Sequence, residues 1–430
     1  MAQRVEPDYN QDHPSTLFEA GTLQGRRVGL DLTSIRPFGP RSGGGGFFVA
    51  SHSVDTAEEG ETRRGFVVIK VVPDDKTRAP RNARREAKLL AKSTSPNVVP
   101  LLNAYLEPRT PSARITLFFP HYPYTLRDLI DAPDFVPIER RGGRRDDDDR
   151  EEETFEALSF EVASQLVSAT AHLHSLSISH RDINPTNVFI DERGHAVLGD
   201  FGIAVEAGDE SPGEQHFEVG TGPYRAPELV FASRAYDAAA IDLWAVASTV
   251  AEMFRPFATP SLSSSSTDSG DEEDQDDDGE EFRRHASSGL DAQPGTARET
   301  KRQSLFTSGS SDFVLAASIF KVVGTPTIES WPEARHLANF ARFSFVAFPP
   351  TRLEAHLPHL VASPHGTCPR RAEVLLEVLD RMLDCSASNR MSAREAHAKL
   401  DELVPNHSRG GGRRGGYESY LRQVVRHKRL

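Results

Sequence analysis

Two short segments constrain this 430-residue chain more than any other feature. The first reads His-Arg-Asp-Ile-Asn-Pro-Thr-Asn and spans residues 180–187, and the second, Asp-Phe-Gly, begins at Asp200. Two short strands joined by a glycine-containing turn are predicted between them, which would bring Asp182, Asn187 and Asp200 to one place. Carboxylate and amide oxygens in such an arrangement can hold a metal-bound phosphate and orient a hydroxyl group.

Residues 26–122 predict a small antiparallel sheet with one helix against it. Short apolar runs rich in β-branched and aromatic residues indicate strands, and apolar residues at three- and four-residue spacing indicate the helix. The predicted strands are Val28–Leu32, Phe47–Ala50, Gly65–Val72, Val98–Leu106 and Arg114–Phe119, and the predicted helix is Arg81–Lys92.

Helical periodicity dominates after Leu126. The predicted helices are Phe155–Leu176, Ile241–Phe254 and Ala372–Leu383, and the predicted strands are Val188–Ile190 and Ala196–Leu198. The expected fold class is therefore α+β, with a small sheet-rich lobe over residues 26–122 and a larger, mainly helical lobe over residues 123–404.

Cysteine content and hydropathy argue against a secreted or membrane-spanning chain. Cys368 and Cys385 are too few for a disulfide framework, and the polar start lacks the apolar stretch of a signal peptide. The most apolar window, Ala238–Phe254, contains Asp242 and Glu252 and falls short of the roughly 20 apolar residues that a spanning helix needs. We therefore expect an intracellular protein, in the nucleus, the cytoplasm or both, without a membrane segment.

The net charge of −13 is concentrated in two runs. Residues 146–153 hold seven acids and one arginine, residues 271–281 hold nine acids, and the remainder carries a net charge of +2. Such acidic runs repel themselves into solvent and do not describe the folded surface. We expect disordered inserts at about 132–153 and 256–302, a polar leader over 1–25, and a basic flexible tail over 405–430 in which a short helix begins near Tyr417.

The motifs and their order resemble the eukaryotic protein kinases. The resemblance implies a bilobal protein kinase fold with ATP and Mg²⁺ as cofactors. It assigns Asp182 to orienting the substrate hydroxyl for in-line transfer, and Asn187 and Asp200 to binding magnesium. It also assigns Lys70, at the end of Val-Val-Ile-Lys, to the α- and β-phosphates, with Glu86 holding it by an ion pair.

The same resemblance identifies nucleotide-binding positions. The family's glycine-loop pattern is met at Gly43 and Gly45, whereas Phe48 stands in place of the third glycine. The positions expected at the adenine site are Phe119, Pro120, His121 and Tyr122.

The run Gly-Thr-Gly-Pro-Tyr-Arg-Ala-Pro-Glu from Gly220 resembles the substrate-docking end of a kinase activation segment, and it contains Thr221 and Arg225. The structural contacts expected from the family are an ion pair between Glu228 and Arg390, and hydrogen bonds from backbone amides of the catalytic loop to Asp242.

Tyr-Arg-Ala-Pro-Glu and the later run from Ile319 to Pro332 resemble the cyclin-dependent and MAP kinase group, which acts on serine and threonine. One departure concerns Asn184, because most serine/threonine kinases have lysine two residues after the catalytic aspartate. An amide donates hydrogen bonds but carries no charge, so we expect weaker stabilisation of the transferring phosphate.

A second departure concerns regulation. Ser211 is the only hydroxyl between Asp-Phe-Gly and the docking segment, and the usual phosphothreonine position falls near His216, with Glu214 and Glu218 beside it. Arg181, whose family role is to bind that phosphate, is expected to meet a carboxylate. The segment would then be ordered without phosphorylation, as in the single-subunit fungal kinases that activate cyclin-dependent kinases.

Several interpretations of function compete. The favoured one is an active serine/threonine kinase whose protein substrate is a cyclin-dependent kinase. An ordinary cyclin-dependent or MAP-like kinase is the alternative, because Ser211-Pro212 has the form of a proline-directed site. Because Asn184 and Phe48 depart from the family pattern, a third interpretation is a pseudokinase, which binds partners without catalysis. The Arg/Gly tail suggests nucleic-acid binding as a further possibility, but we prefer to interpret it as a solvated linker. We expect the protein to be a monomer.

Overall fold

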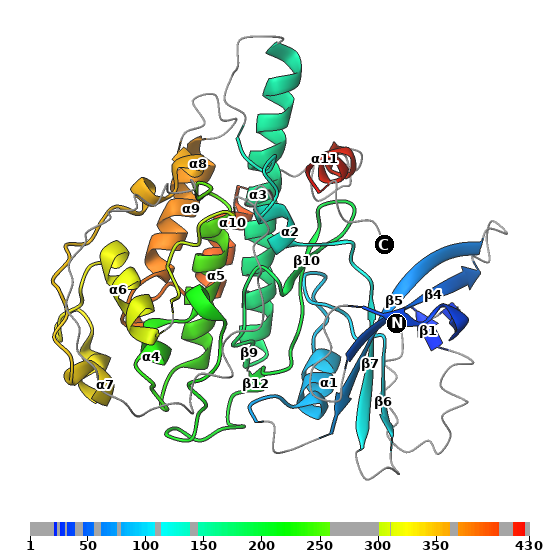
Figure 1. Cartoon of the computed structure of the whole chain (residues 1–430), viewed down its shortest axis with the longest axis horizontal. Helices are drawn as coiled ribbons and strands as arrows, with labels where there is room; N and C mark the ends of the chain where they lie inside the picture. Colours follow the sequence, from blue (N-terminus) through cyan, green and yellow to red (C-terminus); the bar gives the residue numbers. More distant parts are fainter. Residues whose placement is uncertain are drawn as a thin grey trace, which may run out of the picture.

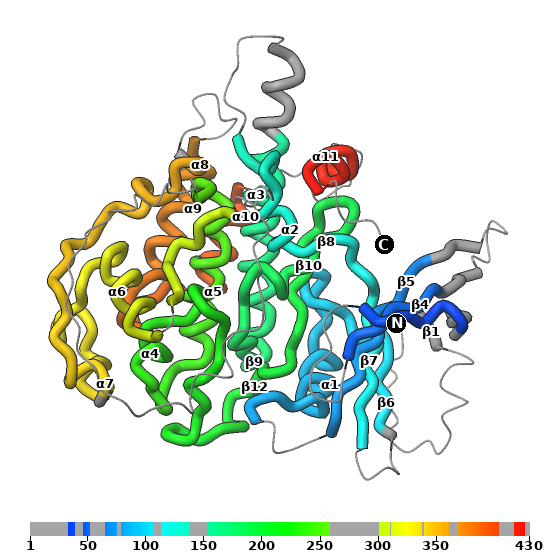
Figure 2. The backbone as a smooth tube through the Cα atoms, in the orientation of Figure 1, coloured from blue at the N-terminus to red at the C-terminus, as the bar shows by residue number. Residues whose placement is uncertain are grey.

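A computed structural model of the chain describes residues 21–23, 26–30, 32–38, 46–55, 62–74, 79–107, 113–137, 145–258, 301–309, 311–361, 369–403 and 416–425. These residues form two lobes (Figure 1). A sheet with one helix makes up the smaller lobe, and helices make up most of the larger one, as the backbone trace in Figure 2 also shows. The predicted α+β class and bilobal layout are confirmed.

The smaller lobe is an antiparallel, seven-stranded sheet. Its strands are β1 Gly21–Leu23, β2 Arg26–Leu30, β3 Arg36–Pro37, β4 Gly46–Asp55, β5 Thr62–Pro73, β6 Asn103–Glu107 and β7 Arg114–Pro120. The order across the sheet is β1-β2-β4-β5-β7-β6, with β3 paired to β4. Val67 and Ile69 of β5 bury one face with Phe118. Because side chains alternate along a strand, Lys70 points to the opposite face, toward the larger lobe.

The strand expected at Val98–Leu106 is shorter than predicted, since β6 begins only at Asn103. Val98 and Val99 are buried, and the backbone nitrogen of Val99 donates to the carbonyl of Leu198 at 2.9 Å. This bond draws the segment toward the larger lobe instead of the small-lobe sheet.

Helix α1, Ala83–Lys92, lies between the sheet and the larger lobe (Figure 1). Asn82 caps it by accepting a hydrogen bond from the backbone nitrogen of Arg85 at 2.9 Å. Its buried face carries Ala87 and Leu90 and also Glu86, which is only 2% exposed. A buried carboxylate requires a partner, so this helix must bring Glu86 to a cation.

The larger lobe is built around α3, Arg145–Ser175, and α5, Ala238–Glu252, which is buried from Ala240 onward. The other α-helices are α2 Leu126–Ile130, α4 Pro227–Val230, α6 Asp312–Val323, α7 Ala338–Ala341, α8 Pro358–Val361, α9 Pro369–Met382, α10 Ala393–Asp401 and α11 Gly416–Val424. The larger lobe has short 3₁₀ helices at Gly222–Tyr224, Pro332–His336, Leu353–His356 and Ala387–Asn389, and the smaller lobe has one at Leu32–Ser34.

Five short strands position the motifs. They are β8 Tyr124–Thr125, β9 Ile178–Ser179, β10 Val188–Ile190, β11 Ala196–Leu198 and β12 Val205–Glu206. Strand β10 pairs with β11 and β8, and β9 pairs with β12. The His-Arg-Asp loop therefore connects β9 to β10, and Asp-Phe-Gly lies between β11 and β12.

The first insert is smaller than the sequence predicted. Helix α3 already begins at Arg145, so residues 145–153 are helical, and Phe135 is fully buried. A helix that is packed further along its length extends at little cost, because each added residue forms another hydrogen bond. Residues 138–144 lie outside the described residues.

The second insert is also shorter at both ends. Arg302 is 4% exposed and donates to the backbone carbonyls of Ile130, Met253 and Phe135. The backbone nitrogen of Ala258 donates to the carbonyl of Lys301 at 2.9 Å. The prediction of disorder was wrong for these flanking residues, and residues 259–300 lie outside the described residues.

The expected leader is too long at its end, because strand β1 falls inside it. Helix α11 begins next to Tyr417, where a short helix was predicted, and it buries Tyr420, Leu421 and Val424 beside α3 (Figure 1).

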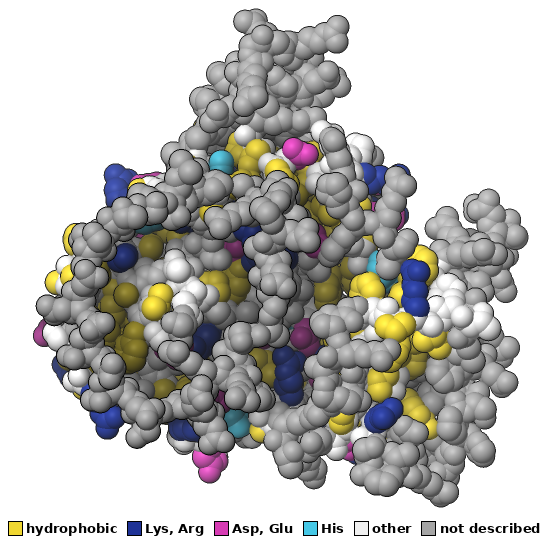
Figure 3. Space-filling model, in the orientation of Figure 1, with side chains coloured by type: hydrophobic (Ala, Val, Ile, Leu, Met, Phe, Trp, Pro, Cys, Tyr) yellow, Lys and Arg dark blue, Asp and Glu magenta, His cyan; other side chains and the backbone are white. Residues whose placement is uncertain are grey.

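Among the described residues, no helix combines the length and apolar character that crossing a membrane requires. On the face drawn in Figure 3, the described acidic and basic side chains are scattered among apolar ones. This distribution agrees with a net charge that resides mainly in the two acidic runs.

Candidate active site

The β10–β11 hairpin brings the two sequence motifs together. Val188 pairs with Leu198, and the backbone nitrogen of Gly199 donates to the carbonyl of Asn187 at 2.8 Å. Asn187 and Asp200 therefore lie at the same end of the hairpin. Asp200 has a φ of 57°, in the left-handed region that few residues other than glycine adopt, so the chain turns sharply at this carboxylate.

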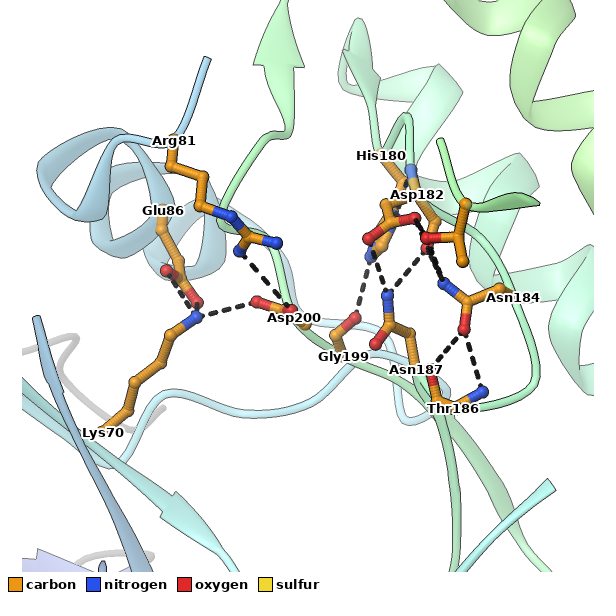
Figure 4. A network of polar contacts seen from close by, with 11 residues as sticks. Lys70, Arg81, Glu86, His180, Asp182, Asn184, Thr186, Asn187, Gly199 and Asp200 are labelled. Atoms are coloured by element: carbon orange, nitrogen blue, oxygen red, sulfur yellow. Dashed lines mark hydrogen bonds and ion pairs between the residues drawn. The ribbon is translucent and has the colours of Figure 1, made fainter. Parts of the chain in front are cut away.

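Lys70 lies between two carboxylates (Figure 4). Its Nζ is 2.7 and 2.9 Å from the carboxylate oxygens of Glu86 and 2.8 Å from Oδ1 of Asp200. Burial disfavours the ammonium, but Glu86 and Asp200 raise the pKa of Lys70 above its ordinary value. Burial likewise disfavours the Asp200 carboxylate, yet Lys70 holds the pKa of Asp200 at about 2. Burial raises the pKa of Glu86, an effect that Lys70 opposes. Side chains from β5, α1 and the Asp-Phe-Gly motif are thus joined in one polar cluster.

Asp182 is surrounded by hydrogen-bond donors. Its Oδ1 accepts from the hydroxyl of Thr221 at 2.5 Å and from Nδ2 of Asn184 at 3.1 Å. Its Oδ2 accepts from Nδ2 of Asn187 at 3.2 Å. Burial raises the pKa of Asp182, an effect that the Thr221 hydrogen bond opposes. The carboxylate is therefore positioned to accept from a hydroxyl group.

The loop that carries Asp182 is fixed by Asp242 of α5. Oδ2 of Asp242 accepts from the backbone nitrogen of His180 at 2.8 Å, and Oδ1 accepts from that of Arg181 at 2.7 Å. Nε2 of His180 lies 2.9 Å from the carbonyl of Gly199. The loop is consequently tied both to a buried helix and to the end of β11.

A cavity of about 1200 Å³ lies between the lobes, and Lys70, Glu86, Asn187 and Asp200 line one part of it. The four positions expected at the adenine site, Phe119, Pro120, His121 and Tyr122, line another part. The Tyr122 ring stacks on that of Phe189 at a centroid distance of 5.7 Å. Burial raises the pKa of Tyr122 to about 12, so its phenol is neutral. Gly43 and Gly45 lie outside the described residues.

The docking segment is held by two arginines. Nη1 and Nη2 of Arg390 each lie 2.7 Å from one oxygen of Glu228, forming a buried, bidentate pair. Arg225 donates to Asp312 at 2.5 Å and to the carbonyl of Leu229 at 3.2 Å. The conformation of this segment is therefore fixed on two sides.

The carboxylate that meets Arg181 belongs to Glu210, and not to either acid beside His216. Nη1 and Nη2 of Arg181 lie 2.6 and 3.1 Å from the two oxygens of Glu210. Arg85 of α1 approaches the same carboxylate at 3.6 Å. Glu214 and Glu218 are exposed. The chemistry was predicted, but the position along the segment was not.

Sequence analysis also missed Arg81. Its Nη1 lies 3.9 Å from Oδ2 of Asp200, a residue that lines the cavity (Figure 4). The available signal was the group of arginines that precedes Glu86, which includes Arg81, Arg84 and Arg85. Nothing in that pattern distinguishes an arginine facing the cleft from one facing solvent.

Comparisons with known proteins agree with this geometry. The family described as the protein kinase domain matches residues 51–400. Cyclin-dependent kinase 20 of Danio rerio is 28% identical over 268 residues, which cover 61% of this chain and 61% of that protein. Cyclin-dependent kinase 7 of Carassius auratus is 29% identical over 225 residues, covering 52% and 47%. Cyclin-dependent kinase 7 of Xenopus laevis is 27% identical over 319 residues, covering 74% and 67%.

The chain therefore matches about half to two thirds of the length of these curated relatives. Among solved structures, the crystal structure of the yeast RNA Pol II CTD kinase CTDK-1 complex contains a chain with a TM-score of 0.53 and 18% sequence identity. The likeness covers 85% of this chain and 92% of that one, and it shows the fold alone. Because the family match spans most of the sequence and both lobes, this chain belongs to the protein kinase family, with cyclin-dependent kinases among its relatives.

Proposed function

We propose that this protein is an ATP-dependent serine/threonine kinase that transfers the γ-phosphate of ATP to a protein hydroxyl. The observation that carries the proposal is a convergence of side chains (Figure 4). Lys70, Asn187 and Asp200 line one cavity, and Asp182 is bonded to Asn187 beside it. The similarity to cyclin-dependent kinases supports serine and threonine as acceptors.

Asp200 and Asn187 fit a hard divalent cation, for which we propose Mg²⁺. Oδ1 of Asp200 is bonded to Lys70, whereas the ion-pair partner of Oδ2 among the described residues is Arg81, at 3.9 Å. Within the described part of the chain, no donor contacts Oδ1 of Asn187, whose Nδ2 is directed at Asp182. Mg²⁺ prefers such oxygens and is typically held by one or two of them together with phosphates. When bound, it would neutralise charge on the triphosphate.

The other residues have separate roles in this proposal. Lys70, fixed by Glu86, orients the α- and β-phosphates. Asp182 accepts the hydrogen bond of the incoming hydroxyl and turns its lone pair toward the phosphorus in line with the leaving group. The hydroxyl of Thr221 now donates to that same Oδ1, which supports Asp182 as an acceptor for a serine- or threonine-like group.

A second cavity supports a polypeptide as the acceptor. It measures about 650 Å³ and is lined by Phe217, Gly222, Arg225 and Leu315, among others. Gly222 follows Thr221, so this cavity begins one residue from a group bonded to Asp182. A protein segment with its hydroxyl at Asp182 would extend into it.

The direct test is phosphate transfer by the purified full-length chain. With Mg·ATP labelled at the γ-phosphate and a general acceptor protein, we expect incorporation of label into serine and threonine. Asp182→Asn should lower the rate by about 100-fold or more, since general-base positioning is lost. Binding of the non-hydrolysable analogue Mg·AMP-PNP, measured by calorimetry, should persist. If the wild type bound the nucleotide but did not transfer phosphate, the result would instead favour the pseudokinase interpretation, which is based on Asn184 and Phe48.

We further propose that the activation segment is ordered without phosphorylation. The pairing of Glu210 with Arg181 supports this, because the Glu210 carboxylate already binds the guanidinium to which a phosphate on the segment would otherwise bind. Protein expressed in bacteria and treated with phosphatase should retain full activity. A strict requirement for phosphate on the segment, including on Ser211, would contradict the proposal.

For the substrate, we propose the activation loop of a cyclin-dependent kinase, with an ordinary cyclin-dependent or MAP-like activity as the alternative. The self-ordered segment favours the first, because an upstream kinase must be active before its target. Incubation with an unphosphorylated cyclin-dependent kinase should produce a phosphothreonine in that kinase's loop, detected by mass spectrometry. Preferential modification of Ser-Pro peptides would support the alternative.

A further inference from the structure

We propose that Arg81 contacts the terminal phosphate of bound ATP and supplies the positive charge that Asn184 lacks. The inference rests on the proposed kinase function, because it concerns how the same cleft binds its nucleotide. It assigns a phosphate-recognition role to a residue that immediately precedes the cap of α1, outside the motifs that identify the family.

The first step is that Asn184 has no donor to offer. Its Nδ2 donates to the carbonyl and to Oδ1 of Asp182, each at 3.1 Å, and to Oγ1 of Thr221 at 3.5 Å, so the two hydrogens of the amide already face three acceptors of the protein. Its Oδ1 accepts from the backbone nitrogen of Thr186 at 2.9 Å. Asn184 is 2% exposed, so it is a structural part of the loop and does not extend into the cleft.

The second step is that the charge of Lys70 is already used to neutralise an acidic cluster. It faces Glu86 and Asp200 together, so its single charge is shared by two carboxylates before any phosphate arrives. A triphosphate adds further negative charge at this point. A second cation beside Asp200 would therefore stabilise the bound nucleotide.

The third step is that Arg81 occupies such a position. The three atoms nearest to a Cβ placed on Gly202 are Nη1 of Arg81 at 3.0 Å, Oδ1 of Asp200 at 3.2 Å and Nζ of Lys70 at 3.7 Å. The guanidinium and the ammonium thus approach the same point from two sides. Figure 4 shows Arg81 extending from the start of α1 toward Asp200.

The base of Arg81 is fixed while its end is free to move. The backbone nitrogen of the next residue, Asn82, donates to the carbonyl of Gly202 at 2.9 Å, which ties the start of α1 to the Asp-Phe-Gly motif. The side chain is 59% exposed, and its 3.9 Å separation from Oδ2 of Asp200 exceeds hydrogen-bond length. This weak contact can be exchanged for a phosphate when a divalent cation takes Oδ2.

The chemical form of the Arg81 side chain suits a phosphate. A guanidinium has several donors in a planar fork that matches phosphate oxygens, so it suits the terminal group of a triphosphate.

The test compares nucleotides with and without that terminal group. Calorimetric dissociation constants for Mg·AMP-PNP and Mg·ADP would be measured on full-length wild type, Arg81→Gln, Arg81→Lys and Arg84→Gln. We expect Arg81→Gln to weaken Mg·AMP-PNP about tenfold while Mg·ADP changes by less than about twofold, since one charge-assisted contact is lost. Arg81→Lys should lie between wild type and Arg81→Gln.

Arg84→Gln is the matched control. Arg84 is the same residue type in the same helix start, but it pairs with Asp74 at 2.6 Å and is 49% exposed. It should bind both nucleotides as the wild type does. Equal weakening of both nucleotides by Arg81→Gln, or no weakening of either, would overturn the assignment. If the wild type bound neither nucleotide, the proposed kinase function itself would fail, which is a distinct result.

Discussion

At the scale of single residues, Glu210 pairs with Arg181, the arginine that the resemblance to other kinases assigns to binding a phosphate. A phosphate carries nearly two negative charges and three acceptor oxygens, whereas Glu210 carries one charge and two oxygens. Both oxygens are nevertheless used, by Arg181 at 2.6 and 3.1 Å, and Arg85 approaches at 3.6 Å. Glu210 therefore provides a permanent and weaker form of the same bridge.

Removing that charge should loosen the activation segment. The Arg181 side chain is fully buried, and leaving a buried charge without its partner costs about 3 to 5 kcal/mol unless the structure opens. We expect Glu210→Gln to lower kcat about tenfold and to speed amide hydrogen exchange across residues 203–220. Exposed Glu214→Gln is the control and should change neither. Unchanged exchange in Glu210→Gln would show that the bridge does not order the segment.

Gly199 is required by its neighbour in the cavity wall. A Cβ at this position would lie 2.3 Å from Cε2 of Phe189, whose ring stacks on Tyr122. We expect Gly199→Ala to lower the free energy of unfolding by about 1 to 3 kcal/mol, a typical cost of overpacking. Urea denaturation would measure it. In a Phe189→Leu background the cost should fall below about 1 kcal/mol, and an undiminished cost there would exclude this contact as the cause.

At the scale of elements, α11 shows how a tail is recruited into the fold. It attaches through its buried residues Tyr417, Tyr420, Leu421 and Val424. Tyr417 lies close to Gly194, because a Cβ built on Gly194 would be 3.3 Å from the Tyr417 ring. The helix thus covers apolar surface of α3 and the β10–β11 turn.

Leu421→Ala tests this attachment. Leu421 is fully buried, and truncating a buried leucine to alanine typically costs about 2 to 5 kcal/mol. The cost here cannot exceed the free energy of detaching α11 alone, which is smaller than that of unfolding the whole protein. We expect the melting temperature to fall by a few degrees. Neighbouring Arg422→Ala should have almost no effect, because its pair with Glu418 is largely exposed. Equal effects of the two substitutions would mean that α11 contributes no packing.

The two residues that flank the second insert, Ala258 and Lys301, lie next to each other. Ala258 is bonded to Lys301, and the guanidinium of Arg302 donates to the backbone carbonyls of Ile130, Phe135 and Met253. Replacing residues 259–300 with Asn-Gly should therefore preserve folding, with kcat within about twofold of the wild type, because a two-residue turn can join a bonded antiparallel pair. Arg302→Leu in the full chain should destabilise it, since those carbonyls lose their donor. Failure of the shortened chain to fold would show that these contacts depend on the insert.

The elements illustrate what a sequence can predict. Strands β10 and β11 were predicted to the residue, because β-branched runs and a glycine turn are local signals. Convergence of Asp182, Asn187 and Asp200 followed from motif spacing. The start of α3 and the burial of Arg302 were not predictable, because packing from distant segments decides them. Glu210 was missed for the same reason, since no periodicity indicates which acid of a loop meets an arginine.

At the scale of the whole molecule, the lobes meet through α1 and its cap. Asn82 is bonded to Gly202 at 2.9 Å, and Lys92 and Lys88 approach Glu206 at 2.5 and 3.3 Å. The buried apolar residues Ala87 and Leu90 of α1 also belong to a hydrophobic cluster that continues into the larger lobe, so apolar packing joins the two lobes together with these polar contacts.

Cys385 reports on the integrity of the larger lobe. Burial raises the pKa of its thiol to about 12, whereas an unperturbed thiol has a value of 9.0. At pH 8 to 9 the native side chain therefore remains a protonated thiol and is inaccessible, so we expect iodoacetamide to leave Cys385 unmodified until denaturant opens the lobe. Mass spectrometry of the peptide containing Cys385 would follow this. Rapid alkylation in the native protein would contradict the packing of α9 against α5.

Arg85 and Glu86 are consecutive residues of one rigid helix, yet one faces Glu210 and the other faces Lys70. Successive side chains on a helix are separated by about 100° of rotation, so neither can be moved alone by turning the helix. A ligand or binding partner that rolls α1 away would separate Glu86 from Lys70 and Arg85 from Glu210 in a single event, leaving Arg181 as the ion-pair partner of Glu210. Displacement of this one helix would therefore break two ion pairs that serve different parts of the site.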